Sequence, residues 1–315
     1  MEKLTFSESS SRFRICTTLL FLKIILSIAL VIFVSVFLFE LLFVNTALGI
    51  EPKTLYFSEE INISKNNGTS ELPQVTAEGN NVYVVWQDNT NGNYDVYFAY
   101  SPDNGRNFES TRNLSKNNGA SELPQVTAEG NNVYVVWQDN TNGNYDVYFK
   151  SSSTNGSKFK SLRNLSKNNG TSELPQIAST SDLFYVFWKD DANGMNSVYF
   201  KEGRKEGSTT NTEFGSSKRI PNSGNVSKPL LTVGGNIFSS SWTSNSANSS
   251  VIKFYPLGFF DDTTDAIQIT KSSPNEKIPN LSITGYDAGI YFVWENKKLS
   301  TSDIFFKRMS NVPDD

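Results

Sequence analysis

The chain has 315 residues, of which 37% are hydrophobic and 19% are charged, and its formal net charge is −4. This composition is typical of a folded protein with one large or two smaller domains, and a mildly acidic chain without a basic stripe is a poor candidate for nucleic-acid binding. The chain contains no histidine, which excludes catalytic triads and metal sites built on histidine. Its single cysteine, Cys16, excludes disulfides within the chain and thiolate zinc sites.

The first predicted element is an apolar helix at residues 17–44. Apart from Lys23 and Glu40 near its ends and a few hydroxyl side chains, this segment is apolar. It is long enough to cross a bilayer, whose core needs about 20 apolar residues. Basic residues before a membrane segment favour a cytoplasmic N-terminus, which predicts that residues 1–16 are cytoplasmic and that the rest of the chain is outside. The basic residues that precede or begin the segment are Lys3, Arg12, Arg14 and Lys23.

Two leading alternatives remain open for the segment at residues 17–44, with a buried core helix as a third. Ala47 and Gly49 are small residues that a signal peptidase accepts, so the leading alternatives are a retained signal-anchor and a cleaved signal peptide. Its length favours the anchor. In both cases the domain at residues 50–315 is exported, either to the cell surface or, after cleavage, as a secreted protein. Asn-x-Ser/Thr sequons recur from Asn62 onward and agree with a glycoprotein, although Asn- and Ser-rich turns also create them by chance.

The exported domain consists of repeats. The stretch at residues 64–98 returns at residues 115–149 with one change, from Thr69 to Ala120. Five tryptophans follow one another at intervals of 51 to 54 residues, and a proline precedes each of them. Repeats of about 50 residues are typical of β-propellers, and we interpret the tryptophans as residues that pack one blade against the next. The tryptophans are Trp86, Trp137, Trp188, Trp242 and Trp294.

Each repeat is predicted to form four strands. QVTAEG, NVYVVWQD and YDVYFAYS are rich in β-branched and aromatic residues and are bounded by Gly and Asn turns, and NFESTRNLS leads into the next repeat. Four strands form one propeller blade. The fifth repeat stops near Ser310 after its third strand, whereas a spare strand, TLYFSEEINIS, precedes the first repeat. Pairing these two ends would remove two exposed sheet edges, which predicts an all-β propeller of five blades closed by its N-terminal strand.

The segment SPDNGRNF at residues 101–108 resembles the Asp-box, or BNR, motif of the sialidase-like propellers. The second repeat has SSTNGSKF at the same place, where Thr154 replaces the aspartate. In that family the Asp-box is a turn that stabilises the fold on the face away from the active site. Known sialidases have six blades, so the resemblance implies a six-bladed propeller as the alternative. The residues that match the motif are Ser101, Asp103, Gly105 and Phe108.

The resemblance assigns no catalytic residue. Sialidases use an arginine triad, a Tyr/Glu pair and an acidic residue, and KRIP at residues 218–221 is similar to their Arg-Ile-Pro motif. However, Arg219 is expected to lie in register with Arg112 and Arg163 on the fourth strand of each blade, which indicates a structural repeat. The fourth repeat has carboxylates without counterparts elsewhere, which an enzyme would recruit or which belong to a surface loop. These are Asp261, Asp262 and Asp265.

Polar loops of the first three repeats are predicted to share one face of the propeller. Repeated weak contacts there would hold a glycan, a cation or a protein partner, whereas the alternative is that Asp88 and Asp95 only fix their own hairpin. A calcium ion held by Asp88, Asn91 and Asp95 is considered, but the spacing is not that of a calcium loop, and no other cofactor is expected. The candidate binding residues are Glu71, Asp88, Tyr94, Glu122, Asp139, Tyr145, Glu173 and Asp190.

The sequence therefore predicts a membrane-anchored, outward-facing β-propeller that acts as a binding or interaction module, with a cell-surface glycan or protein as partner. The alternative is a sialidase-like glycoside hydrolase, because glycosidase chemistry needs only two suitably separated carboxylates. The sequence leaves open whether the protein is an enzyme, and favours a binding protein.

Overall fold

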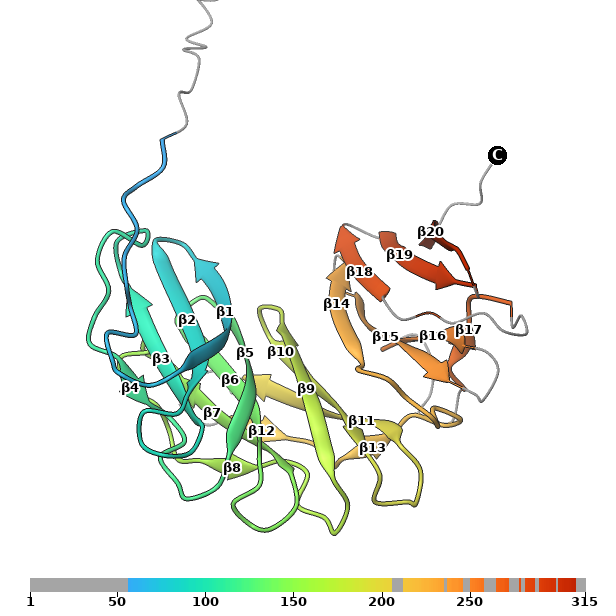
Figure 1. Cartoon of the computed structure of the whole chain (residues 1–315), viewed down its shortest axis with the longest axis horizontal. Coiled ribbons are helices and arrows are strands. Elements are labelled where there is room, and N and C mark those ends of the chain that lie inside the picture. Colours follow the sequence, from blue (N-terminus) through green and yellow to red (C-terminus); the bar gives the residue numbers. More distant parts are fainter. Residues whose placement is uncertain are drawn as a thin grey trace, which may run out of the picture. The chain divides into compact units, whose positions relative to one another are not determined.

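We analysed a computed structural model of the chain (Figure 1). The chain divides into two compact units, residues 1–61 and 62–315. The described residues contain strands and loops and no helix, which confirms the all-β prediction for this part of the chain. Among them, no helix is long and apolar enough to cross a membrane. The predicted segments 1–16 and 17–44 lie outside the described residues, which are 56–205, 212–234, 237–245, 250–257, 265–271, 278, 281–286, 289–298 and 300–309.

The strands form five antiparallel sheets in chain order. The first sheet contains β1 (Ser70–Glu78), β2 (Asn81–Asp88), β3 (Asp95–Ser101) and β4 (Arg112–Asn113). The second contains β5 (Ser121–Glu129), β6 (Asn132–Asp139), β7 (Asp146–Ser152) and β8 (Arg163–Asn164). The third contains β9 (Ser172–Ser179), β10 (Leu183–Asp190) and β11 (Ser197–Lys205), and β11 pairs with both β12 (Thr212–Phe214) and β13 (Lys218–Arg219). The predicted four-strand unit is thus confirmed for the first two repeats.

The two C-terminal sheets follow the same order of strands. The fourth sheet contains β14 (Leu230–Gly234), β15 (Ile237–Asn245), β16 (Ser250–Pro256) and β17 (Ile267–Gln268). The fifth contains β18 (Leu281–Tyr286), β19 (Gly289–Lys297) and β20 (Ser302–Met309). In the first three sheets a hairpin with a glycine at positive φ joins the second and third strands; Gly92, at φ 102°, is the example in the first sheet. Glycine adopts this backbone conformation without a steric penalty.

Aromatic side chains fill the space between consecutive sheets. Each of the four apolar clusters contains buried residues from two neighbouring sheets, and Trp137, Trp188, Trp242 and Trp294 belong to these clusters. Four-stranded antiparallel sheets that pack face to face in chain order have the arrangement of β-propeller blades. One aromatic pair marks each interface: Phe98 with Phe159 (4.9 Å between ring centroids), Tyr134 with Phe184 (4.5 Å), Tyr185 with Phe238 (4.7 Å) and Phe254 with Phe292 (5.5 Å).

The N-terminal segment is not a strand where the structure describes it. Residues 56–64 of the predicted strand belong to no strand, so this part of the prediction is wrong. Within the described residues β20 pairs with β19. Closure of the ring by the N-terminal segment stays a prediction. The number of blades therefore remains a prediction.

Gly203 provides a test of the packing within the third sheet. It lies opposite Phe184 in the β10–β11 ladder, and a Cβ atom at this position would overlap the ring of Phe184, which is 1% exposed. We expect Gly203→Ala to lower the free energy of unfolding by about 1–3 kcal/mol, the usual cost of overpacking a core. Thermal unfolding measures the change. The control is Gly215→Ala, where the nearest atom would be the carbonyl oxygen of Glu202 at 3.8 Å; equal effects of both substitutions would contradict the packing.

Candidate functional site

A buried carboxylate ends the second strand of each of the first three sheets. In the second sheet, Asp139 has no exposed surface. Its Oδ2 atom accepts hydrogen bonds from Asn117 Nδ2 (2.5 Å), Ser121 Oγ (2.7 Å) and Trp137 Nε1 (3.2 Å). Its Oδ1 atom accepts one from the backbone N–H of Thr141 (2.9 Å). The carboxylate therefore joins the incoming loop, the first strand, the second strand and the hairpin turn.

The same arrangement recurs around Asp88 and Asp190, which are also fully buried. Three of the candidate binding residues are thus bonded within the protein, and we leave them out of the proposed site. Burial raises the pKa of Asp88, but hydrogen bonds from Ser70, Thr90 and Asn66 outweigh this effect and hold the pKa below its usual value. The partners are Asn66, Ser70, Trp86 and Thr90 for Asp88, and Asn168, Ser172, Trp188 and Ala192 for Asp190.

The direction of this pKa shift predicts how stability depends on pH. A carboxyl group with a lowered pKa contributes stability above its unfolded pKa, and this contribution is lost as the pH falls through the folded pKa. We expect Asp88→Asn to be less stable than the wild type by about 1–3 kcal/mol at about pH 7, because a buried hydrogen-bond network is disrupted.

The difference should begin to shrink as the pH falls below about 3.8, the ordinary pKa of an aspartate, and should be lost as the pH falls through the lower pKa of folded Asp88. Thermal unfolding of both proteins across this range measures it. Asp182→Asn changes an exposed aspartate and serves as the control. A difference between wild type and Asp88→Asn that stays constant with pH would contradict the role of the charge.

The second aspartate of the hairpin is also engaged by the chain. Asp95 is 2% exposed and accepts hydrogen bonds from Asn113 Nδ2 (2.7 Å) and Ser115 Oγ (2.9 Å). Asn91, the third residue of the considered calcium site, donates from Nδ2 to Tyr97 Oη (2.9 Å). Within the described part of the chain, no group of three or more Asp, Glu, His or Cys side chains is suited to hold a metal ion.

The remaining candidate residues form pairs at the surface. In the first sheet Tyr94 Oη donates to Glu71 Oε2 (3.1 Å), and in the second Tyr145 Oη donates to Glu122 Oε2 (2.8 Å). Burial and the hydrogen bond to Glu122 raise the pKa of Tyr145 to about 12. In the third sheet Glu173 instead forms an ion pair with Lys189, with 2.7 Å between Oε2 and Nζ. The structure thus brings the predicted Tyr and Glu residues together in two of the three sheets.

A strained backbone bulge follows each of these glutamates. Leu72, Leu123 and Leu174 have φ angles of 50°, 52° and 56°, although each precedes a proline and leucine rarely adopts positive φ. The ladder between the first and second strands shifts register at this point in all three sheets. Two of the N–H groups at the bulges are bound across the sheet interface, because Gln87 Oε1 accepts from Leu123 N (3.1 Å) and Gln138 Oε1 accepts from Leu174 N (3.0 Å).

Gln87 and Gln138 contact the candidate glutamates, and the sequence prediction missed them. Each also donates from Nε2 to the glutamate of its own sheet, at 3.3 Å to Glu71 and 3.4 Å to Glu122. The glutamine therefore orients the glutamate and at the same time ties its sheet to the next one. The glutamine is visible in the sequence, because it repeats in the identical VWQD segments. The sequence does not show which backbone N–H donates to its side-chain oxygen.

The Asp-box has the geometry of a turn. Ser101 Oγ donates to Asp103 Oδ1 (2.8 Å) and accepts from the N–H of Gly105 (2.9 Å), which has φ 80°. Hydrogen bonds from the side chain and backbone of Asn107 lower the pKa of Asp103 to about 2. All these contacts are local. In the second sheet the aromatic residue of the equivalent turn, Phe159, packs against the first sheet.

The arginine of the KRIP segment does not lie where the sequence analysis placed it. Leu114 and Ile220 donate their N–H groups to equivalent carbonyls of the third strands (2.7 and 2.9 Å), which aligns these two residues. Arg219 is therefore equivalent to Asn113, and the predicted register with Arg112 is wrong by one residue. Arg112 has a structural role, since its Nη1 donates to two backbone carbonyls of the second sheet at 2.6 Å each.

Of the carboxylates peculiar to the fourth repeat, Asp261 and Asp262 lie outside the described residues. Asp265 is exposed, and its Oδ2 atom accepts a hydrogen bond from Asn222 Nδ2 (2.6 Å). One side-chain contact on an exposed loop gives no indication of catalysis.

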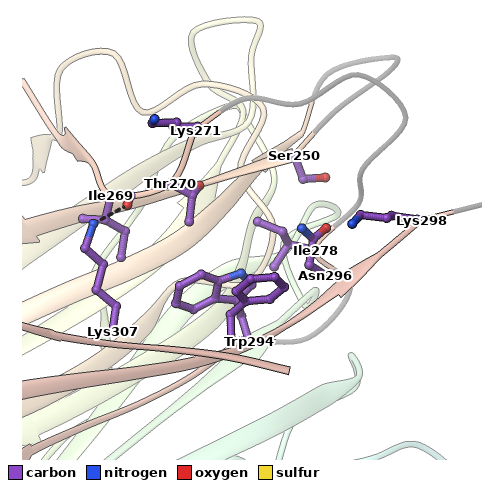
Figure 2. A pocket seen from close by; sticks show the side chains of 10 residues that line it. Ser250, Ile269, Thr270, Lys271, Ile278, Trp294, Asn296, Lys298 and Lys307 are labelled. Carbon is purple, nitrogen blue, oxygen red and sulfur yellow. Dashed lines mark hydrogen bonds between the residues drawn. The ribbon is translucent and has the colours of Figure 1, made fainter. Parts of the chain in front are cut away.

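A pocket of about 350 Å³ lies between the fourth and fifth sheets. Figure 2 shows its side chains around the indole of Trp294. The sequence analysis did not predict this pocket. Its lining residues are Ser250, Ile269, Thr270, Lys271, Ile278, Trp294, Asn296, Lys298, Phe305 and Lys307.

Comparisons with protein-family models and with curated protein sequences give no match. Solved structures with partial likeness include the catalytic domain of a GH62 α-L-arabinofuranosidase from Coprinopsis cinerea, with 13% identity, a TM-score of 0.38 and coverage of 79% of this chain and 92% of that one. A GH43 endo-arabinanase from Bacillus licheniformis has 12% identity, a TM-score of 0.39 and coverage of 75% and 92%. A PL25 ulvan lyase has 14% identity, a TM-score of 0.47 and coverage of 78% and 65%. These scores are too low to carry a conclusion about this chain.

Proposed function

We propose that the protein is an exported, membrane-anchored β-propeller that binds glycans through the Tyr–Glu pairs of its first two sheets. The apolar segment at residues 17–44 would hold it in the cell membrane, with the C-terminal domain outside. The observation that carries the proposal is the repetition of the Tyr94–Glu71 pair as Tyr145–Glu122, on equivalent positions of neighbouring sheets.

The chemistry of each pair suits a sugar. The tyrosine offers a ring face to the C–H groups of a pyranose, and the carboxylate accepts hydrogen bonds from sugar hydroxyls. In the first sheet Tyr94 and Gln87 both donate hydrogen bonds to Oε2 of Glu71, and the other carboxylate oxygen, Oε1, accepts no hydrogen bond from the described residues. The carboxylate is thus held in place before a ligand arrives, which lowers the entropy lost on binding.

The repetition favours a polymer over a single sugar. Two equivalent sites on one rigid scaffold convert the second contact into an intramolecular one, and weak contacts then add up to a useful affinity. The third sheet differs at this position, because Glu173 is neutralised by Lys189 and Asn196 stands in place of the tyrosine. We therefore expect two binding positions of the same chemistry, on the first and second sheets.

Removal of the two hydroxyl groups tests this proposal. Full-length protein in detergent is screened on a glycan array, and the best ligand is titrated against the wild type, Tyr94→Phe, Tyr145→Phe and the double variant. We expect each single variant to weaken binding about threefold to tenfold, and the double variant to lose more than either single one, since each lost hydrogen bond costs about 0.5–1.5 kcal/mol.

Tyr100→Phe is the control, because its hydroxyl also donates to a side chain of the first sheet, Asn81 Oδ1 at 3.3 Å, but not to Glu71. Binding by the double variant as tight as that of the wild type would refute the proposed site. Release of sugar products from the bound glycan would instead support the alternative of a glycoside hydrolase.

A further inference from the structure

The pocket between the fourth and fifth sheets lies where the first three sheets keep their buried aspartates. Trp294 pairs with Phe305 in the β19–β20 ladder as Trp86 pairs with Tyr97 in the first sheet. Two residues beyond the tryptophan, the first sheet has Asp88 and the fifth sheet has Asn296. A neutral amide therefore replaces the carboxylate beside the indole, and a cavity of about 350 Å³ adjoins both side chains.

A second carboxylate is missing on the other wall. In the first sheet Ser115 Oγ accepts from Val96 N (2.9 Å) and donates to Asp95 Oδ1 (2.9 Å). At the pocket Thr270 Oγ1 accepts from Ile252 N in the same way (2.9 Å), but the residue equivalent to Asp95 is Val251, which has no acceptor in its side chain. The hydroxyl of Thr270 therefore has no equivalent of Asp95, the carboxylate to which the hydroxyl of Ser115 donates a hydrogen bond in the first sheet.

The described lining of the pocket is positively charged, whereas the chain as a whole has a net negative charge of −4. Three of the ten described lining residues, Lys271, Lys298 and Lys307, are lysines, and none of these ten is acidic. Lys307 uses one of its three N–H donors on the carbonyl of Ile269, at 2.8 Å, as the dashed line in Figure 2 shows. Lysines around a partly enclosed cavity attract an anion more strongly than lysines in open solvent do.

We propose that this pocket binds a sugar that carries a carboxylate, such as a uronic acid. The carboxylate of the ligand takes the place of the two carboxylates that the repeat has lost here, between the lysines and the hydroxyl of Thr270. The rings of Trp294 and Phe305, 5.7 Å apart and nearly parallel, provide the apolar wall for the C–H face of the sugar ring. A volume of about 350 Å³ falls within the roughly 300–1,000 Å³ of small-molecule sites.

This site is separate from the Tyr–Glu pairs and stands on different residues. Calorimetric titration of the full-length protein with glucuronate tests it, with glucose and acetate as the two partial ligands. We expect saturable binding of glucuronate. Glucose and acetate should each bind at least about tenfold more weakly, because glucose lacks the carboxylate and acetate lacks the sugar ring. Acetate as tight as glucuronate, or no saturable binding of glucuronate by the wild type, would overturn the proposal.

Substitution of the lysines locates the binding. Lys271→Gln combined with Lys298→Gln should weaken glucuronate binding about tenfold or more, since two cations are removed. Lys297→Gln is the matched control, because Lys297 is adjacent in sequence and exposed but does not line the pocket, and its affinity should stay within about twofold of the wild type.

Asn296→Asp restores the residue of the first three sheets. Its carboxylate should compete with that of the ligand and abolish binding while the melting temperature is retained, as the same Trp–Asp pair is part of the first three sheets. An unchanged affinity of Asn296→Asp, or of the Lys271/Lys298 double variant, would overturn the proposal. Tyr145→Phe should leave glucuronate binding unaltered, which separates the outcome here from that of the glycan site on the first two sheets.

Discussion

The buried aspartate at the end of the second strand is the interaction on which the first three sheets depend. A single carboxylate binds the loop that enters the sheet, the first strand, the tryptophan of the second strand and the turn into the third. A buried charge is costly unless its lone pairs are satisfied, and here they are satisfied by the segments that have to be held together. The side chains that bind this carboxylate, an Asn, a Ser and a Trp, accordingly recur at the same spacing in all three repeats.

The two C-terminal sheets show what happens without this carboxylate. Ser244 and Asn296 stand in its place, and Trp242 Nε1 is buried with no hydrogen-bond acceptor in the part of the chain that the structure describes. Strand β15 also contains the hydroxyls of Ser239, Ser240 and Ser241, which are buried and have no hydrogen-bond partner among the described residues. A buried unsatisfied polar group costs about 1–3 kcal/mol. Across the interface with the third sheet, the fourth sheet packs through aromatic contacts such as that of Phe238 with Tyr185.

Sequence reasoning reached the strands, the hairpins and the turn at residues 101–108 because each depends on local residue types. Gly92 and Gly105 adopt the positive φ angles that their turns require, and Asp103 binds the neighbouring amides. The bulge at Leu123 was beyond it, because the residue before a proline normally avoids this conformation. Only the ladder with β6 and the hydrogen bond to Gln87 of the preceding sheet favour it here. The same limit explains the error in the register of Arg219, since a one-residue shift along a two-residue strand leaves no pattern in the sequence.

The two candidate sites also differ in whether the sequence could predict them. Glu71 and Tyr94 were predicted because they repeat, and a repeat is visible in a sequence. The pocket at Trp294 was not predicted because it lies where the fourth and fifth repeats lack the repeated aspartates. The loss of a repeated residue does not show that a cavity has formed in its place. The buried carboxylate explains this difference between the two candidate sites. In the first three sheets its oxygens bind segments of the chain itself and cannot serve a ligand. Where Asn296 and Val251 replace the two aspartates, the sheet gives up part of that stabilisation, and the lysine-lined cavity gains room for a carboxylate from outside.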